Sequence, residues 1–379
     1  AMATNNNDKT LNVPHLRFPE FSGEWEEEQL DSIATLSKGI GISKEQLSED
    51  GEPCILYGEL YTKYKSEIIK QVESKTDIDC SKLKRSKAND VIIPCSGETA
   101  VDIATARCVP FDNILLGGDL NIISLHKYDG AFMSYQLNGK RKYDIARVAQ
   151  GVSVVHLYGE HLKAIKTYNP SLPEQQKIAK LLSLIDERIA TQNKIIEKLE
   201  SLIRGLCLKL VSQGIPNTTL NTCLECHSSI LQEKSVTTDG KYPVYGAAGI
   251  CGYSDTPEAS GDSILIIKDG ASVGATFYVS GKYSAIGTLN RLTARHGCSL
   301  RYLYYCLKIF DFSQYKTGQA IPHIYFRDYG IAKIWCPSLA QQEHIAGILT
   351  SIDTKIQMER SLLEHLTIQK RFLLQNMFI

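Results

Sequence analysis

An internal repeat constrains the fold of this chain more than any other feature. The segment from Asn169 to Leu210 recurs from Cys336 to Met377 at a constant shift of 167 positions, without a gap. The same register extends upstream, where His156-Leu157-Tyr158 aligns with His323-Ile324-Tyr325. A match of this length predicts that one structural unit occurs twice along the chain.

Both repeated segments have the apolar period of a helix with one buried stripe. Pro173 fits the first turn of the first helix, and Gly214 followed by Pro216 would end it. Because a narrow stripe is buried only against a second helix, we predict two long antiparallel coiled-coil helices, although a generic hairpin or dimerisation stalk would show the same period. The stripes comprise Ile178, Leu182, Ile185, Ile189, Ile196, Leu199, Ile203, Leu206 and Leu210, and then Ile345, Leu349, Ile352, Ile356, Leu363, Leu366 and Leu373.

The regions before each helical segment match each other more faintly. Aligned pairs are Leu30-Asp31-Ser32-Ile33 with Leu220-Asn221-Thr222-Cys223, Asp90-Val91-Ile92-Ile93 with Asp262 and Ile264-Leu265-Ile266-Ile267, and Leu120-Asn121 with Leu289-Asn290. They are typical of buried strands that end in turns. We therefore predict an α+β protein with an internal pseudo-two-fold repeat: a mixed α/β domain at 17–168, a helix at 169–214, a second domain at 215–335 and a second helix at 336–379.

Composition adds weaker constraints. A length of 379 residues favours two or three domains. Lys plus Arg and Asp plus Glu each number 42, so no basic excess indicates nucleic acid and none excludes it. Eleven scattered cysteines indicate reduced thiols. The polar N-terminal stretch and the lack of a long apolar run predict a cytoplasmic protein without a membrane span.

Several of these residues resemble the specificity subunits of Type I restriction-modification systems. Trp25 followed by Leu30 resembles the opening of that family's first domain, and Tyr242-Pro243 with Tyr245-Gly246 resembles the start of many second domains. The resemblance extends over almost the whole chain, from about residue 18 to residue 378.

The start of each long helix carries the most specific part of the resemblance. Pro170 to Gln175 followed by Ile178 is similar to the family's Pro-x-x-x-Glu-Gln-x-x-Ile motif. The second copy has Gln341-Gln342 where Glu-Gln is usual, which we expect to change only a capping detail, because Glu343 still supplies an acid to the first turn.

The resemblance implies that each domain is a target-recognition domain that reads one half of a bipartite double-stranded DNA target. Half-sites about one turn, 34–36 Å, apart suit two similar readers, and a helix pair of about 60 Å fixes a spacing better than a flexible linker. The outer helix faces would dock two methyltransferase subunits, for which Glu187, Arg188, Lys194 and Lys198 are candidates, although these charges would equally suit a solvated face. S-adenosylmethionine for adenine methylation, and ATP with Mg²⁺ for restriction and translocation, would belong to partner subunits.

The sequence lacks the motifs of catalysis. Gly39-Ile40-Gly41 stops after two glycines, and Asn169-Pro170-Ser171-Leu172 lacks the second proline and the aromatic residue of a base-holding tetrad. The Pro-Asp dipeptide of one nuclease class and the Gly-x-x-x-x-Gly-Lys-Ser/Thr phosphate loop do not occur. We therefore expect no catalytic residue and a non-catalytic subunit.

One motif has the spacing of a haem-attachment site or of half a zinc site, Cys223-Leu224-Glu225-Cys226-His227. It aligns with Ile33 to Ser37, and no second cysteine pair follows at a suitable distance. We therefore interpret both cysteines as apolar strand residues and expect no metal site. His156 and His323 are interpreted as structural residues at a domain–helix junction.

Residues that contact DNA are predicted from polar loop positions, because phosphates bind hydroxyls and backbone N–H groups, whereas base edges bind Lys, Arg, Asn and Gln. Two alternatives remain open: a coiled-coil adaptor that joins two non-DNA ligand domains, and a methyltransferase with an unrecognised cofactor site. The candidate DNA-contacting residues are Tyr61, Lys63, Ser96, Thr99, Asn121, Lys140, Arg141, Lys268, Ser272, Asn290, Arg291, Lys316 and Gln319.

Overall fold

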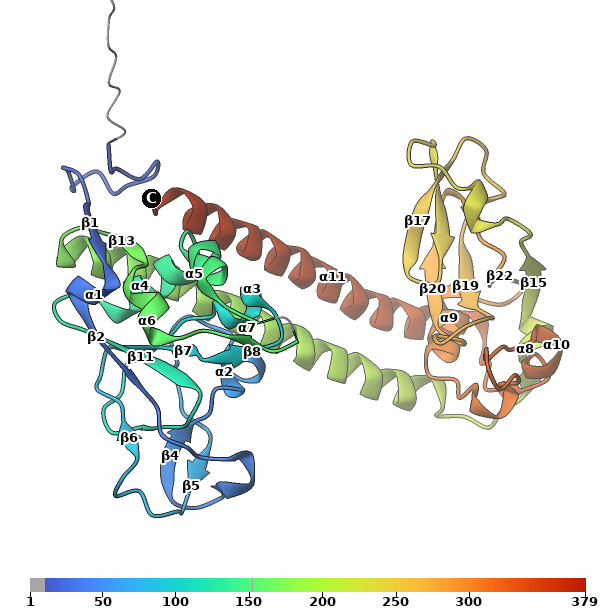
Figure 1. The fold of residues 1–379 in the computed structure, drawn as a ribbon. Coiled ribbons are helices and arrows are strands. Elements are labelled where there is room, and N and C mark those ends of the chain that lie inside the picture. Colours follow the sequence, from blue (N-terminus) through green and yellow to red (C-terminus); the bar gives the residue numbers. More distant parts are fainter. Residues whose placement is uncertain (1–10, 152) are drawn as a thin grey trace, which may run out of the picture. The chain divides into compact units, whose positions relative to one another are not determined.

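The computed structural model describes residues 11–151 and 153–379, which form two compact units (Figure 1). The first unit contains the chain as far as Gln192 together with Leu362–Ile379, and the second contains Asn193–Ser361. The boundary passes through both long helices. Each unit therefore consists of one domain and a segment of each helix.

The first domain is built on a four-stranded antiparallel sheet in the order β2-β11-β7-β9. These strands are β2 (Ala34–Lys38), β11 (Leu120–Leu125), β7 (Asp90–Pro94) and β9 (Arg107–Val109). A second sheet has the order β3-β5-β4-β10-β6, from β3 (Leu47–Ser48), β5 (Lys75–Thr76), β4 (Glu52–Ile55), β10 (Leu115–Leu116) and β6 (Lys84–Arg85). Two short pairs are β1 (Glu26–Gln29) with β13 (Lys166–Asn169) and β8 (Ser96–Gly97) with β12 (Val155–His156). The short helices are α1 (Leu30–Ile33), a 3₁₀ turn (Lys44–Gln46), α2 (Glu59–Thr62), α3 (Ala100–Ile103), α4 (Gly130–Asn138), α5 (Lys142–Val148) and α6 (Gly159–Lys163).

The second domain repeats this plan with the main sheet order β15-β22-β19-β20. Its strands are β15 (Leu224–Ser228), β22 (Leu289–Ala294), β19 (Ser263–Ile267) and β20 (Thr276–Val279). The second sheet is β17 (Gly249–Ser254), β16 (Tyr242–Gly246), β21 (Lys282–Ala285) and β18 (Ala259–Ser260), and β14 (Thr218–Thr219) pairs with β23 (Lys333–Ile334). The short helices are α8 (Leu220–Cys223), α9 (Leu300–Lys308) and α10 (Phe326–Tyr329), with 3₁₀ turns at Glu233–Ser235 and Ser313–Tyr315.

One inner strand of each main sheet, β7 or β19, is buried on both faces. In β7, Val91 and Ile93 join the core that contains α4, whereas Ile92 joins the core on the side of the second sheet. In β19, Leu265 and Ile267 join one core, whereas Ile264 and Ile266 join the core on the opposite face. Successive strand residues point to opposite faces, so a continuous apolar run is the expected sequence of a strand covered on both sides.

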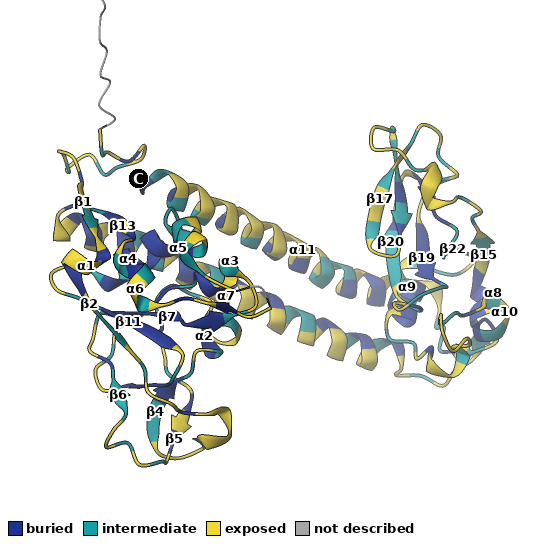
Figure 2. Cartoon of the chain, viewed as in Figure 1, coloured by how far each residue is buried: buried dark blue, intermediate teal, exposed yellow. Residues whose placement is uncertain are grey.

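The two long helices are α7 (Leu172–Val211) and α11 (Leu339–Asn376). In the first unit, Leu182 near the start of α7 shares a core with Leu373 near the end of α11. In the second unit, the end of α7 and the start of α11 share another core, and Arg360 Nη2 lies 2.5 Å from Glu200 Oε1. The pairing is therefore antiparallel in both units, and buried and exposed positions alternate along both helices (Figure 2).

The buried stripe of α7 differs from the predicted one near its end. Leu206 and Leu210 are only half-buried, whereas Cys207 and Val211 are 1% and 5% exposed. Ile203, Cys207 and Val211 follow each other in steps of four, and each such step rotates past one 3.6-residue turn. The stripe consequently drifts around the helix. Among the described residues, no helix combines the length and apolar character that crossing a membrane requires.

A buried ionic cluster joins the first domain to both long helices. Lys370 Nζ of α11 lies 2.6 Å from Glu67 Oε2 and 2.7 Å from Asp186 Oδ1 of α7, and Tyr135 donates to Asp186 over 2.7 Å. Burial alone would favour the neutral amine, but the two carboxylates outweigh it and raise the pKa of Lys370. The lysine is therefore the counterion of two buried acids.

The substitution Lys370→Met should destabilise the first unit strongly, because it leaves two carboxylates buried without their cation. We expect a loss of about 3–5 kcal/mol in the free energy of unfolding. Urea denaturation followed by Trp25 fluorescence in a Trp335→Phe background would measure it, since Trp25 belongs to the core of this unit. Lys163→Met, which removes an exposed partner of Glu160, is the matched control and should change stability little. Equal effects of the two substitutions would contradict the assignment.

Candidate nucleic-acid interface

Both long helices begin with the same hydrogen-bonded junction. The side chain of Gln175 accepts a hydrogen bond from the backbone N–H of Asp129, the N-cap of α4, over 2.9 Å and donates to the carbonyl of Pro170 over 2.8 Å. Gln342 accepts from the N–H of Ser299, the N-cap of α9, over 2.8 Å and donates to the corresponding proline. Both glutamines are 1% exposed. The repeated glutamine thus fixes each domain on its helix, a role that the motif alone did not reveal.

The acidic residue before the first glutamine has a different role from the expected capping. Glu174 is 1% exposed and forms a bidentate ion pair with Arg17, with N–O distances of 2.7 and 2.8 Å. Its counterpart Gln341 is exposed. The second copy therefore lacks the contact with the N-terminal segment, and Gln341 instead accepts from the hydroxyl of Ser338, just before α11, over 3.2 Å.

Three loops meet at the end of strand β7 in the first domain. The backbone N–H of Cys95 donates to the carbonyl of Asp119 over 2.7 Å, and the carbonyl of Cys95 accepts from the N–H of Leu157 over 2.8 Å. We call the loops 95–99, 117–119 and 150–158, apart from residue 152, the first strand-end site.

The second domain builds the same arrangement. The N–H of Lys268 donates to the carbonyl of Thr288 over 2.9 Å, and the carbonyl of Lys268 accepts from the N–H of Ile324 over 2.9 Å. The loops 268–274, 287–288 and 316–325 form the second strand-end site. Cys95 and Lys268 thus occupy the same backbone position with different side chains.

The third loop of each site is closed by a reciprocal backbone pair. Gln150 and His156 exchange N–H···O bonds of 2.8 and 2.6 Å, and Thr317 and His323 exchange bonds of 2.9 and 2.8 Å. These residues correspond at the shift of 167 positions. The two histidines lie on these loops, which corrects the expectation that they mark a domain–helix junction.

Each closed loop exposes apolar and aromatic side chains at equivalent positions. Val154 is 52% and Ile321 is 64% exposed, whereas Tyr158 and Tyr325 are 45% and 43% exposed. Sequence reasoning missed these four residues, because it searched for polar side chains. The constant register of the repeat was the signal that could have found them.

A cation lies beside the exposed tyrosine in both sites. Lys38 Nζ is 5.7 Å from the ring centroid of Tyr158, and the guanidinium of Arg327 is 4.7 Å from that of Tyr325. Each pair therefore combines a flat apolar ring with a positive charge. A sugar or base can pack on such a ring, and a phosphate can bind such a charge.

In the first domain, Ser96 and Thr99 lie in the strand-end site, but both are engaged internally. Ser96 donates to Asp119 over 3.0 Å, and Thr99 caps α3. Tyr61 donates to the carbonyl of Ser96 over 3.0 Å, and its burial raises the pKa of the phenol. The hydroxyl of Tyr61 therefore stays neutral, and its hydrogen bond holds the loop 95–99 in place.

Two other candidates of this domain also have internal partners. Asn121 is 1% exposed and donates to the carbonyl of Leu157 over 2.9 Å, so it holds the third loop in place. Lys63 is exposed, lies 2.7 Å from Glu59 and lines a hollow of about 880 Å³ that reaches the turn at Asp119.

In the second domain the structure brings four of the candidates together. Lys268 and Ser272 lie on the loop after β19, and Lys316 and Gln319 lie on the closed loop. The two loops are joined by a hydrogen bond from the N–H of Gly270 to the carbonyl of residue 322, over 2.9 Å. All four side chains are exposed or partly exposed.

Asn290 and Arg291 lie on the neighbouring strand β22. Asn290 is 5% exposed and accepts from Ser228 over 3.0 Å, which gives it a supporting position like that of Asn121. Arg291 is partly exposed and, with Ser228, lines a hollow of about 270 Å³.

The remaining candidates lie elsewhere. Lys140 and Arg141 lie between α4 and α5, where Arg141 donates to the carbonyl of Ile379 over 3.0 Å and lies 3.3 Å from Asp144. Neither Lys140 nor Arg141 lies in the first strand-end site. The docking candidates on α7 are all exposed, and Glu187 lies 3.0 Å from Lys70. They are Glu187, Arg188, Lys194 and Lys198.

The strand-end sites contain the groups of a binding surface: backbone N–H groups, hydroxyls, amines and exposed rings. Within residues 11–151 and 153–379, a group of three neighbouring potential metal ligands occurs at Cys223, Cys298 and Cys336, outside both sites.

Comparison with known proteins agrees with this architecture. Residues 22–201 and 225–367 match the family described as Type I restriction modification DNA specificity domain. The chain is 27% identical over 113 residues to the Type I restriction enzyme EcoprrI specificity subunit of Escherichia coli, and this match spans 28% of that protein. It is 24% identical over 282 residues, 68% of this chain and 73% of the other, to a putative type I specificity subunit of Mycoplasma genitalium.

Two solved structures share the fold. The S subunit of a Type I restriction-modification system from M. genitalium has a TM-score of 0.71 at 21% identity, over 97% of this chain and 99% of that one. A chain from a structure that describes complex assembly and conformational transition of the type I R-M system has a TM-score of 0.54 at 15% identity, over 93% and 97%.

The junction glutamine provides a test of the first unit. Gln175→Ala removes the partner of two backbone groups, the part-buried N–H of Asp129 and the buried carbonyl of Pro170, and an unpaired buried group costs about 1–3 kcal/mol. Unfolding followed by Trp25 fluorescence in the Trp335→Phe background should show that loss. Gln176→Ala, a change of the exposed neighbour, should show almost none. If both variants unfold at the same urea concentration, the glutamine does not hold the junction.

Proposed function

Because the chain belongs to the family of Type I restriction modification DNA specificity domains, we propose that it is the sequence-reading, non-catalytic subunit of such a complex. The target-recognition domains are assigned to 17–168 and 215–335, and each reads one half of a bipartite double-stranded DNA target. The observation that carries the proposal is the repetition of one strand-end site in both domains, on equivalent backbone hydrogen bonds.

The two sites share a frame and differ in their side chains, as two readers of different half-sequences require. Where the first site has Cys95, the second has Lys268, and the closed loop of the second adds Lys316 and Gln319. Lys and Gln side chains bind base edges, whereas hydroxyls and backbone N–H groups bind phosphate. Asn121 positions the third loop of the first site, whereas Asn290 is buried against β15; neither asparagine is placed to contact bases.

The exposed apolar groups suit the same ligand. Val154 and Ile321 can contact sugar or thymine methyl groups, and Tyr158 and Tyr325 offer a ring face next to a cation. Their equivalence in both domains favours a contact that both half-sites share, such as the sugar–phosphate backbone, over a base-specific one.

The long helices have two roles in this proposal. They set the spacing between the half-sites, and their exposed faces dock two methyltransferase subunits, which bring S-adenosylmethionine and methylate adenine. Restriction and translocation subunits bring ATP and Mg²⁺. The exposed charges of α7 at Glu187, Arg188, Lys194 and Lys198 are the docking candidates.

The first experiment is to express the chain with its neighbouring methyltransferase subunit and to detect N6-methyladenine by single-molecule sequencing. We expect a bipartite motif with two short defined halves around a fixed gap. Lys268→Ala should relax one half only, by about 1–3 kcal/mol of discrimination at one position. Lys333→Ala, on β23 outside the site, is the matched control.

Other outcomes would reject the proposal. Methylation without a motif, or none despite a stable complex, would favour an adaptor that joins two non-DNA ligand domains. Binding of S-adenosylmethionine by the isolated chain would instead favour a methyltransferase.

The spacing role has its own test. Seven residues inserted into both helices, after Gln192 and after Ser361, extend each by about 10 Å, and one added heptad keeps the apolar stripe in register. We expect the unread gap to grow by about three base pairs at 3.4 Å each, with both half-sites unchanged. Insertion into α7 alone should abolish methylation, because it shifts one stripe against the other. An unchanged gap after the double insertion would show that the helices do not set it.

A further inference from the structure

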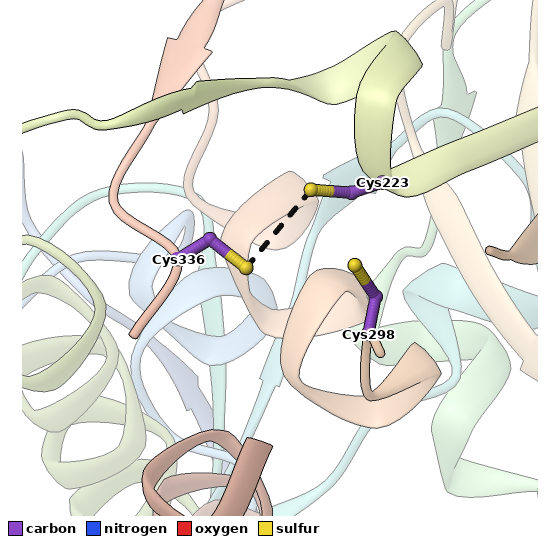
Figure 3. A group of neighbouring side chains, drawn as sticks. All are labelled: Cys223, Cys298 and Cys336. Atoms are coloured by element: carbon purple, nitrogen blue, oxygen red, sulfur yellow. Dashed lines mark hydrogen bonds between the residues drawn. The ribbon is translucent and has the colours of Figure 1, made fainter. Parts of the chain in front are cut away.

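Three cysteines of the second unit converge although they are far apart in the sequence (Figure 3). Cys223 ends α8, Cys298 precedes α9, and Cys336 lies between β23 and α11. Their Sγ atoms all lie within 4.8 Å of one another, and those of Cys223 and Cys336 are 3.9 Å apart. Figure 3 shows the three thiols pointing toward a common centre.

These distances match the geometry of a thiolate metal site. Zn–S bonds of about 2.3 Å in a tetrahedral site place neighbouring sulfurs roughly 3.8 Å apart. The three Sγ atoms therefore stand near three corners of such a tetrahedron. A disulfide would join only two of them, at about 2.05 Å, and would leave the third without a role.

The ligand set differs from the one that the sequence motif indicated. Cys226 packs against the core, and the imidazole of His227 is hydrogen-bonded to Thr293 over 3.1 Å. Cys223 itself is the last residue of α8, which corrects the expectation that both cysteines occupy strand positions. The zinc-like spacing was thus misleading, although its first cysteine does belong to a thiol cluster.

The first unit shows what this position does in the fold. There the residue before the N-cap of α4 is Tyr128, and the residue equivalent to Cys336 is Asn169. Glu28 of β1 joins them, because it accepts from Tyr128 over 2.6 Å and from Asn169 over 3.0 Å. One carboxylate therefore ties the domain to the start of α7. At the equivalent points the second unit has Cys298 and Cys336.

We propose that Cys223, Cys298 and Cys336 bind one thiophilic cation of the Zn²⁺ class, which fastens the second domain to the start of α11. Soft thiolates select such ions, and a solvent molecule completes the fourth position. Cys298 and Cys336 are partly exposed, so the ion and the solvent ligand can reach the site, whereas Cys223 is 2% exposed.

Binding requires no oxidant or reductant. Three S–H bonds break, three sulfur–metal bonds form, and three protons leave to solvent. Burial raises the pKa of Cys298 to about 11 and also raises those of Cys223 and Cys336, so the free thiols are protonated at neutral pH. The cation must therefore displace protons, and its binding can be followed by their release.

The test uses the full chain, a phosphine reductant and Zn²⁺ titrated against a chromophoric chelator. We expect one equivalent bound, and thiolate-to-metal charge-transfer absorption when Co²⁺ replaces Zn²⁺. Cys336→Ser and Cys298→Ser should each weaken binding at least as much as loss of an outer-shell partner does, about 10–100-fold. Cys251→Ser, at an exposed thiol of β17, is the matched control and should bind as the unchanged chain does.

Three results would overturn the proposal: no bound Zn²⁺, affinity unchanged in both Cys298→Ser and Cys336→Ser, or equal loss in Cys251→Ser. A Cys223–Cys336 disulfide in the purified chain, detected by mass, with no metal taken up after reduction, would also overturn it. Cys336→Asn introduces the residue of the first unit and provides a folded comparison should the serine variant fail to fold. None of these outcomes bears on DNA recognition, so the two proposals can fail separately.

Discussion

Neither long helix can bury its apolar stripe alone, and the rest of the structure depends on the way in which the two stripes meet. In the first unit Leu182 of α7 packs with Leu373 of α11, and the cation of Lys370 neutralises Asp186 and Glu67. Residues from the end of the chain therefore complete a domain that lies near its beginning. Each unit is built around helix segments that are distant in the sequence, so neither domain is an independent stretch of chain.

The repeated architecture separates what both domains share from what differs between them. The shared part is backbone and buried amide: the central strand, the junction glutamines Gln175 and Gln342, and the closed loops. The variable part is the side chains on those loops, such as Cys95 against Lys268. A frame that tolerates such exchange suits recognition, because loop residues can change without loss of the core.

The sequence predicted the frame well because its signals are local. Apolar period indicated the helices, and the runs at Val91–Ile93 and Ile264–Ile267 indicated strands that the structure buries on both faces. The candidate DNA contacts remain predictions, and the structure shows that some of them have internal partners. Asn121 and Arg141 are polar in the sequence, but one supports a loop and the other holds the carbonyl of Ile379. Spacing along a chain does not reveal which polar groups are already engaged.

The sequence by itself determined the repeat, the two long helices, the order of the domains and the family. The apolar period indicates the helices, and alignment of the chain with itself indicates the repeat and the order of the domains. Tertiary structure alone decided which side chains face solvent and which distant residues meet. Cys223 and Cys336 are 113 positions apart, and Glu67 and Lys370 are 303 apart. Contacts at such separations arise only when the helices and sheets pack, since no local propensity brings those atoms together.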